Sequence, residues 1–318
     1  LFRSVAQISI NLTDISVTPM HVAFDEACKK AQERGVRVTG SELVGLVPLR
    51  AMLDAGRYFL EKQQRSVGVS DGELIKIAVK SLGLSDLYPF KPEEKIIEYA
   101  LAAKRGKQAR LVDLSVQRFV EETASESPAP GGGSVAAAMG AMGAALGTMV
   151  ANLSSHKRGW DAQWKEFSDH AARGKVEHDL LLRLIDDDTA AFNAIMAGFS
   201  MPKGTDDEKK ARKAHIQAAT RRAIEVPLLV METCLATMSL ARDMAATGNP
   251  NSVSDAGVGA LAARAGVRGA WLNVRINCQS LQDKVFVAEV LARAAEIERK
   301  AADLEAEILR IVDEKIGG

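Results

Sequence analysis

The pattern of apolar and polar positions divides the chain into two regions with different predicted secondary structure. Within residues 1–101, the alternation over 5–12 and the short run over 36–39 predict strands, and residues 1–11 fit an extended segment. Helical spacing follows Pro19, Leu49 and Ser70 in the same region. We therefore expect an α+β fold here, with too few strands to form a sheet on its own.

A short basic segment, residues 102–112, predicts a linker between the two regions. From Asp113, which we expect to cap the next helix, the spacing of apolar positions is helical to the end of the chain. Pro227 lies within this pattern and either begins a new helix or kinks a continuing one. Residues 113–318 are thus predicted to be an all-α bundle of about seven helices.

The segment 129–147 combines a glycine-rich loop with an uncharged helix of small residues. Pro130 is followed by Gly131, Gly132, Gly133 and Ser134, and then by a run of Ala, Gly and Met. One interpretation is a flexible bend with Ser134 as the helix N-cap. The other is a nest of backbone N–H groups at a helix N-terminus, suited to an anion or a carbonyl group.

Gly140, Gly143 and Gly147 follow on one face of this predicted helix. Such a face lets another helix approach closely, either within the chain or between subunits, and predicts packing rather than ligand binding. The apolar run 135–151 is of marginal length for a membrane span and only weakly hydrophobic. We therefore expect a buried helix of a soluble protein.

Three consecutive carboxylates, Asp186, Asp187 and Asp188, interrupt an apolar helical pattern. They either form an exposed acidic turn or include a functional group. Asp188 is four residues from both Leu184 and Phe192, which places it on the apolar face. A carboxylate near a core has a raised pKa, as a general acid or base requires.

A polar loop over 248–255 and two asparagines farther along provide further candidates. Asp255 follows a cluster of residues that are ordinary helix caps. Asn273 and Asn277 are four residues apart among apolar neighbours, which suits either a hydrogen-bond network between helices or recognition of a heterocycle edge. The basic stretch 203–213 predicts a solvated face or a contact for an anionic tail.

Composition and charge narrow the class of protein. The chain has 318 residues, with 41 basic and 41 acidic side chains and 5% aromatic residues, so we expect no nucleic-acid partner and no membrane surface. Its three cysteines (Cys28, Cys234 and Cys278) are isolated, and neither they nor the scattered histidines have metal-binding spacing. These features predict a cytoplasmic protein with reduced thiols and no bound metal.

Several motifs occur in a fixed order in the second region: the 130–134 loop with its Ala-rich helix, 186–192, 201–203, Val226-Pro227, and 248–255 continuing to Asn273 and Asn277. Together they resemble the formiminotetrahydrofolate cyclodeaminase family. Residues 1–101, through 6–12, 40–48 and 96–99, resemble the C-terminal subdomain of glutamate formiminotransferase. The chain is thus similar to the rear portion of a bifunctional enzyme of histidine degradation, and we expect transferase activity only together with the family's N-terminal subdomain.

The resemblance implies an ammonia-lyase that converts 5-formiminotetrahydrofolate to 5,10-methenyltetrahydrofolate. The substrate would be a tetrahydrofolate derivative, with or without a polyglutamate tail, and there would be no metal or redox cofactor. The enzyme would be a homo-oligomer, either a dimer or a ring of dimers. The resemblance places the catalytic aspartate within 186–188. Asp186 is favoured by the Leu-Ile-Asp motif, and Asp188 by its position on the apolar face of the predicted helix. The expected folate-binding residues are Gly131, Gly132, Gly133, Ser134, Asp255, Asn273 and Asn277.

Two other functions fit the same residues. One is methenyltetrahydrofolate cyclohydrolase, a related enzyme on the same scaffold, although the attached transferase remnant favours the deaminase. The other is a helical oligomerisation module without catalysis, which the presence of the aspartates and the glycine loop disfavours. Release of ammonia and appearance of methenyl absorbance from 5-formiminotetrahydrofolate would separate the deaminase from the other two.

Overall fold

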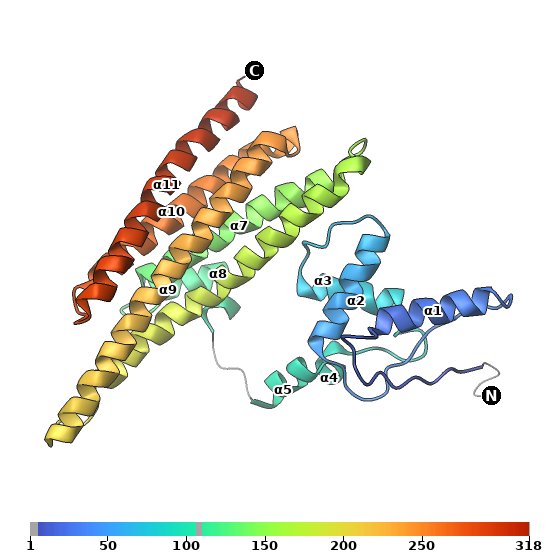
Figure 1. The fold of residues 1–318 in the computed structure, drawn as a ribbon, viewed down its shortest axis with the longest axis horizontal. Coiled ribbons are helices and arrows are strands. Elements are labelled where there is room, and N and C mark those ends of the chain that lie inside the picture. The colour runs from blue at the N-terminus through green and yellow to red at the C-terminus, as the bar shows by residue number, and fades with distance from the viewer. Residues whose placement is uncertain (1–5, 106–109, 318) are drawn as a thin grey trace. The chain divides into compact units, whose positions relative to one another are not determined.

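The computed structural model describes residues 6–105 and 110–317, and the chain divides into two units, residues 1–108 and 109–318. In the first unit (Figure 1) the α-helices are α1 Met20–Gln32, α2 Leu49–Lys62, α3 Asp71–Ser81, α4 Pro92–Lys95 and α5 Ile97–Arg105. In the second they are α6 Val116–Thr123, α7 Gly132–Ser155, α8 Trp164–Phe199, α9 Asp206–Thr247, α10 Val253–Cys278 and α11 Lys284–Ile316, with short 3₁₀ turns η1 Leu111–Asp113, η2 Asp161–Gln163 and η3 Pro250–Ser252.

The strands predicted in the first unit do not form. Among residues 6–105, the β-type pairing is one parallel bridge, between Val47 and Ile96. Ile8 and Ile10 are largely exposed, and residues 36–39 form no β bridge with any other described residue. Because a strand requires hydrogen bonds to a neighbour, extended segments without one remain loops. The α+β prediction is therefore not confirmed, and residues 1–5 lie outside the described part of the chain.

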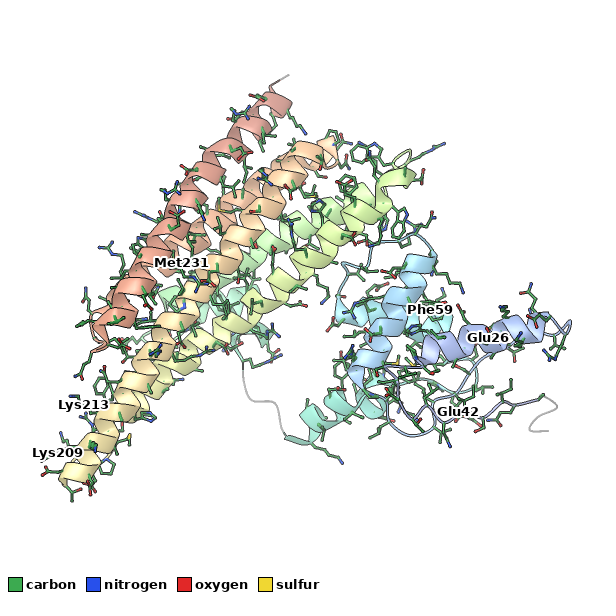
Figure 2. All side chains as sticks on the ribbon, viewed as in Figure 1. Glu26, Glu42, Phe59, Lys209, Lys213 and Met231 are labelled. Carbon is green, nitrogen blue, oxygen red and sulfur yellow. The ribbon has the colours of Figure 1, made fainter. Side chains whose placement is uncertain are left out.

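Helices α2 and α3 form the core of the first unit. Met52 and Leu74 are completely buried where these helices meet, and Phe59 of α2, labelled in Figure 2, is 7% exposed. Ser70 caps α3 by accepting the Glu73 N–H at 3.2 Å. The start of α2 at Leu49 and of α3 at Asp71 agree with the sequence prediction.

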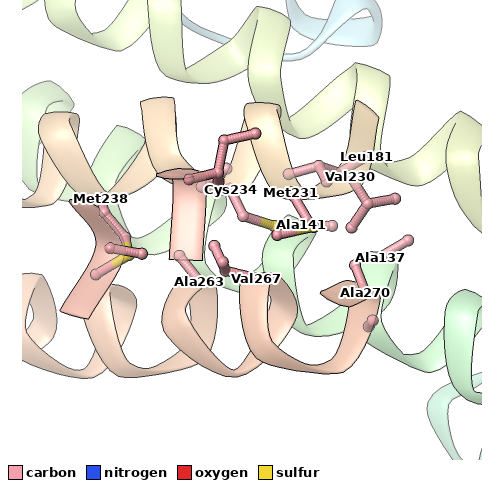
Figure 3. Packing of buried hydrophobic residues seen from close by; sticks show 14 of the residues in the cluster. Ala137, Ala141, Leu181, Val230, Met231, Cys234, Met238, Ala263, Val267 and Ala270 are labelled. Carbon is pink, nitrogen blue, oxygen red and sulfur yellow. The ribbon is translucent and has the colours of Figure 1, made fainter. Parts of the chain in front are cut away.

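Five long helices, α7 to α11, form the bundle of the second unit. Helix α7 packs against α8, α9 and α10, and its small residues let those helices approach closely. In Figure 3, Ala141 of α7 lies near Cys234 of α9 and Val267 of α10 in the buried cluster. The Gly140 face is therefore used for packing within the chain.

One helix boundary differs from the prediction, and of the two alternatives for Pro227 the structure has the continuing helix. Ser115, rather than Asp113, caps α6 by accepting the Arg118 N–H at 3.2 Å, while Asp113 pairs with Arg110. Pro227 lies inside one continuous helix, α9. The described part of the second unit thus has six α-helices instead of about seven.

Helices α7 and α9 are each long and apolar enough to cross a membrane by length and composition. In the bundle, 56% of the most apolar 18-residue stretch of α7 and 67% of that of α9 are buried. Such burial is typical of the core helices of a helical bundle, and composition alone is weak evidence for a span.

The close crossing of α7 and α10 yields a stability prediction. A Cβ atom on Gly143 would lie 2.6 Å from the carbonyl oxygen of Gly259 in α10. Because this obstacle is backbone, Gly143→Ala is expected to lower the free energy of unfolding by about 1–3 kcal/mol, measured by chemical denaturation. Gly257→Ala, whose Cβ would meet only the Val312 side chain at 3.3 Å, is the matched control. Equal stability of the two variants would contradict this account of the crossing.

Candidate active site

A cavity of about 120 Å³ opens at the N-terminal end of α7, between α8, α9 and α10. It contains six of the residues that the sequence predicted as catalytic or folate-binding. Its lining comes from the loop before α7 and from all four helices: Pro128, Ala129, Gly131, Gly132, Gly133, Asp188, Thr189, Phe192, Ile195, Ala223, Asn273 and Asn277.

The carboxyl group of Asp188 is the one titratable group in this lining. Burial raises its pKa above the ordinary value for aspartate, and hydrogen bonds from the Ser134 hydroxyl and backbone N–H offset part of this rise. The hydroxyl oxygen of Ser134 lies 3.1 Å from Asp188 Oδ2. A raised pKa brings the group closer to the range in which it both accepts and donates a proton near neutral pH.

Ser134 is a buried hydrogen-bonding partner of Asp188. It is completely buried, and its hydroxyl lies 2.9 Å from the Ile185 carbonyl oxygen and 3.3 Å from Thr189 Oγ1. A serine has only one hydroxyl proton, so at any moment it donates to one of Ile185, Asp188 and Thr189. When it donates to Ile185, a protonated Asp188 can donate to Ser134 in turn. The serine thus accommodates both protonation states of the aspartate.

The glycine loop lies beside a carboxylate of the protein itself, that of Asp188. Helix α7 begins at Gly132, with Gly131 as its N-cap, so the expectation of Ser134 as N-cap is wrong. A Cβ atom on Gly133 would lie 2.7 Å from Asp188 Oδ2 and closer still to Oδ1. The backbone N–H of Ser134, in the first turn of α7, donates to Asp188, so the positive end of this helix stabilises the protein's own carboxylate.

Consecutive positions on α8 are rotated by about 100°, so the three aspartates have different partners. Asp186 accepts the backbone N–H of Leu111 at 2.7 Å, and Asp187 pairs with Arg222 at 3.3 Å. Asp188 alone among them lines the cavity. Asp186 thus anchors the segment before α6.

Asp255 also lies outside the cavity. It is in the first turn of α10, eighteen residues before Asn273 on the same helix. With a rise of 1.5 Å per residue, this separation corresponds to about 27 Å. Asp255 and Asn273 therefore cannot contact the same small group within one chain.

Asn273 and Asn277 contribute the polar lining from α10, and the Asn273 amide lies beside Gly132 of the glycine loop. Asn273 Nδ2 donates to the Gly269 carbonyl oxygen at 3.0 Å, one turn earlier on α10. Asn277 Nδ2 donates across to the Ala223 carbonyl oxygen of α9 at 2.7 Å. Both interpretations offered for this pair, a network between helices and a polar edge for a ligand, are thus compatible with their positions.

Two family models match this chain. The model described as formiminotransferase-cyclodeaminase matches residues 115–296, and the formiminotransferase domain model matches residues 3–102. The chain belongs to the formiminotransferase-cyclodeaminase family. The cavity lies within the cyclodeaminase match.

Individual relatives support both halves of this match. A formimidoyltransferase-cyclodeaminase of Sus scrofa is 40% identical over 312 residues, covering 96% of this chain and 56% of the relative. A methenyltetrahydrofolate cyclohydrolase of Methylorubrum extorquens is 39% identical over 202 residues, covering 64% of this chain and 97% of the relative. The chain thus spans just over half the length of the bifunctional relatives that it matches.

A solved structure matches the helical unit. The crystal structure of formiminotetrahydrofolate cyclodeaminase from Thermotoga maritima aligns with a TM-score of 0.57 and 26% identity, covering 64% of this chain and 98% of that one. The helical bundle that carries the cavity is thus a cyclodeaminase fold.

Sequence reasoning missed several residues of this cavity in the cyclodeaminase part. Thr189 and Ile195 share the α8 face that Asp188 and Phe192 define, so helical periodicity was an available signal. Ala223 precedes Pro227 by four residues, and a proline within a helix frees the carbonyl group at that position. Ala129 begins the glycine-rich segment, whereas Pro128 has no comparable signal.

A larger cleft, of about 410 Å³, lies in the formiminotransferase part of the chain. Lys76, Lys80 and Phe90 are among its lining residues. It has no buried titratable side chain comparable to Asp188, so the smaller cavity is the better catalytic candidate. Among the described residues, no three His, Cys, Asp or Glu side chains are grouped so as to hold a metal ion.

Proposed function

We propose that this protein is a formimidoyltetrahydrofolate cyclodeaminase and an ammonia-lyase, part of a bifunctional glutamate formimidoyltransferase-cyclodeaminase. The single observation that carries this proposal is the half-buried Asp188, with its raised pKa, in a cavity on the cyclodeaminase fold. The family models for both parts are consistent with the bifunctional assignment.

In the proposed reaction, N10 of the folate attacks the formimino carbon on N5. The formimino group enters in its protonated form, –CH=NH2+: the N10–carbon bond forms while the C=N double bond becomes single. Once the nitrogen has received the N10 proton, the remaining C–N bond breaks, NH3 leaves and the positive charge stays on the methenyl product. Asp188 takes the proton from N10 and delivers it to the departing nitrogen, so the carboxyl group is regenerated. Because both reacting nitrogens belong to one molecule, the cavity chiefly has to hold the folate in the bent conformation. This mechanism requires no metal or redox cofactor.

We infer that only the reactive part of the folate enters the cavity. Its volume, about 120 Å³, is well below the 300 Å³ or more that encloses a drug-sized ligand. Phe192, Met196 and Phe199 form a partly exposed apolar row that leads along α8 away from the cavity. The aminobenzoyl ring can lie along this row.

The end of the α8–α9 hairpin is basic and could receive the tail of a polyglutamylated folate. Figure 2 shows Lys209 and Lys213 there, where the hairpin extends beyond the other helices of the bundle. Arg212 lies close to Phe199, at the end of the apolar row, and donates to its carbonyl oxygen at 3.3 Å. The order of the apolar row and the cationic end fits a folate whose glutamates extend outward.

The second candidate is a methenyltetrahydrofolate cyclohydrolase. The observation in its favour is the Methylorubrum extorquens relative, which is named for that activity and is matched over almost its whole length. The same carboxyl group could activate water for attack on the methenyl carbon. The formiminotransferase part of this chain favours the deaminase, because that domain's reaction would generate the deaminase substrate.

One assay tests the proposal. We expect the purified chain to convert 5-formiminotetrahydrofolate to the methenyl product, followed by its absorbance, with one ammonia released per product. Activity on methenyltetrahydrofolate with formation of the 10-formyl compound, and none on the formimino substrate, would instead identify the cyclohydrolase. Inactivity on both, with the helical bundle folded, would favour the non-catalytic oligomerisation module.

We also propose that the protein is a cytoplasmic homo-oligomer. All three cysteines are free, as expected in a reducing compartment. The adjacent helices α7 and α10 leave large apolar side chains exposed, which a second subunit would cover. These are Met142, Met149, Leu153, Val258, Leu261, Leu272 and Ile276. Sedimentation of the purified chain as a monomer would contradict this proposal.

A further inference from the structure

Pro227 creates an unusual backbone position in the wall of the cavity. Proline has no N–H group, so the carbonyl oxygen of Ala223, four residues earlier in α9, has no donor within its own helix. Ala223 is only 7% exposed, and it lines the cavity. A buried carbonyl group without a partner is costly, so some other donor must replace the missing N–H.

The side chain of Asn277 is that donor. Its Nδ2 reaches the Ala223 carbonyl oxygen at 2.7 Å from the neighbouring helix α10. This bond determines the orientation of the amide, because only the nitrogen side can donate to a carbonyl group. The side-chain oxygen Oδ1 is therefore left as the acceptor of a residue that lines the cavity.

No hydrogen bond in the described ranges 6–105 and 110–317 uses this oxygen. Asn273, one turn earlier, is arranged in the same way, with Nδ2 donating to the Gly269 carbonyl oxygen. The part of the lining that α10 contributes thus presents side-chain acceptors, and no cationic side chain lines the cavity. Such a wall suits a ligand edge that carries N–H donors.

We propose that Asn277 accepts a hydrogen bond from the N–H donor edge of the folate pterin ring, and that Pro227 positions it by leaving the Ala223 carbonyl group free. The inference rests on the proposed function, since a pterin carries a ring N–H and an amino group on one edge. Asn277 then determines specificity for that edge. Pro227 is a positioning residue that does not contact the substrate.

The structural part of this inference is tested without ligand. Asn277→Leu removes the donor and is expected to lower the thermal unfolding midpoint of the second unit by about 5 °C. Adding Pro227→Ala supplies a backbone N–H for Ala223, so the double variant should regain the parental midpoint. If the double variant is no more stable than Asn277→Leu, the coupling between the two residues is overturned.

The binding part uses 5-formyltetrahydrofolate as a stable probe, titrated by calorimetry. The stable double variant is expected to bind about tenfold more weakly than the parent chain, because the acceptor is absent although the fold is restored. Pro227→Ala alone keeps the acceptor but releases the amide, and a loss of about two- to threefold is expected. Parental affinity in the double variant would overturn the binding role and leave Asn277 as a helix-bridging residue only.

A third measurement identifies the ligand edge. A 2-desamino-2-methyl analogue of the same probe lacks the amino donor. The parent chain should discriminate against it about tenfold, and the double variant should bind both compounds equally. Equal discrimination by the two proteins would overturn the assignment of the edge to Asn277. If the parent chain binds no folate at all, the proposed function itself fails, whereas the ligand-free stability cycle still reports on Pro227 and Asn277.

Discussion

Asp188→Asn is expected to lower kcat for ring closure by about 10²–10⁴-fold, the usual contribution of a positioned general acid or base. Asparagine has nearly the same shape and still accepts the Ser134 N–H, so the substrate should bind with little change in Kd. It cannot take a proton from N10 or return one to the leaving nitrogen. The rate of methenyl formation under single-turnover conditions, together with ammonia release, measures the effect.

Asp186→Asn is the matched control, two positions away in the same helix. Its side-chain oxygen can still accept the Leu111 N–H, and it does not line the cavity. We expect its kcat to stay within a few-fold of the parental value. A large loss in Asp186→Asn with little loss in Asp188→Asn would reverse the assignment and restore the choice favoured by the Leu-Ile-Asp motif.

The raised pKa of Asp188 also predicts how stability depends on pH. Below the pKa of the unfolded state the group is protonated in both states, and burial of its charge has no effect. As the pH rises through the unfolded value toward the higher folded value, the native state is penalised, and the penalty is complete above the folded pKa. Asp188→Asn removes it, so the variant's gain in unfolding midpoint should be larger at pH 8 than at pH 4. An equal gain at both would contradict the raised pKa.

Helical periodicity explains why part of this site could be predicted. Asp188 lies on the face defined by Leu184 and Phe192, and Asn273 and Asn277 lie one turn apart, as their spacing predicts. The same geometry separates Asp186 from Asp188 by about 200° around the helix. The helix face on which an aspartate lies was thus a better guide to the cavity than the Leu-Ile-Asp motif, which favoured Asp186.

Contacts between distant segments could not be predicted in this way. That Gly133 accommodates a carboxylate, and that Ala223 requires a donor from α10, depend on how α7, α8, α9 and α10 pack. The local pattern also fails to predict secondary structure where a segment has no neighbouring strand to pair with, as for the segment of Ile8 and Ile10. Their alternation is typical of a strand, but the described residues provide nothing to pair with it.

Gly133→Ala is expected to reduce ring closure almost as severely as Asp188→Asn, although residue 133 has no reactive group. The added Cβ would lie within 2.7 Å of Asp188 Oδ2 and closer to Oδ1, so the carboxylate has to leave its position at the start of α7. Alanine is otherwise favoured over glycine within a helix, by about 0.5–1 kcal/mol, and Gly133 does not have a positive φ angle. The fold should therefore survive, and the loss should appear in kcat.

Gly132→Ala separates this effect from a general disturbance of the loop. Its Cβ would meet only the amide of Asn273, at the ordinary contact distance of 3.4 Å, so a loss of a few-fold in kcat/KM is expected. Circular dichroism and the unfolding midpoint should show both variants folded. If Gly133→Ala retains parental kcat while folded, Asp188 does not act from the position that α7 gives it. The glycine loop would then be a packing feature of the bundle and not the support of its catalytic carboxyl group.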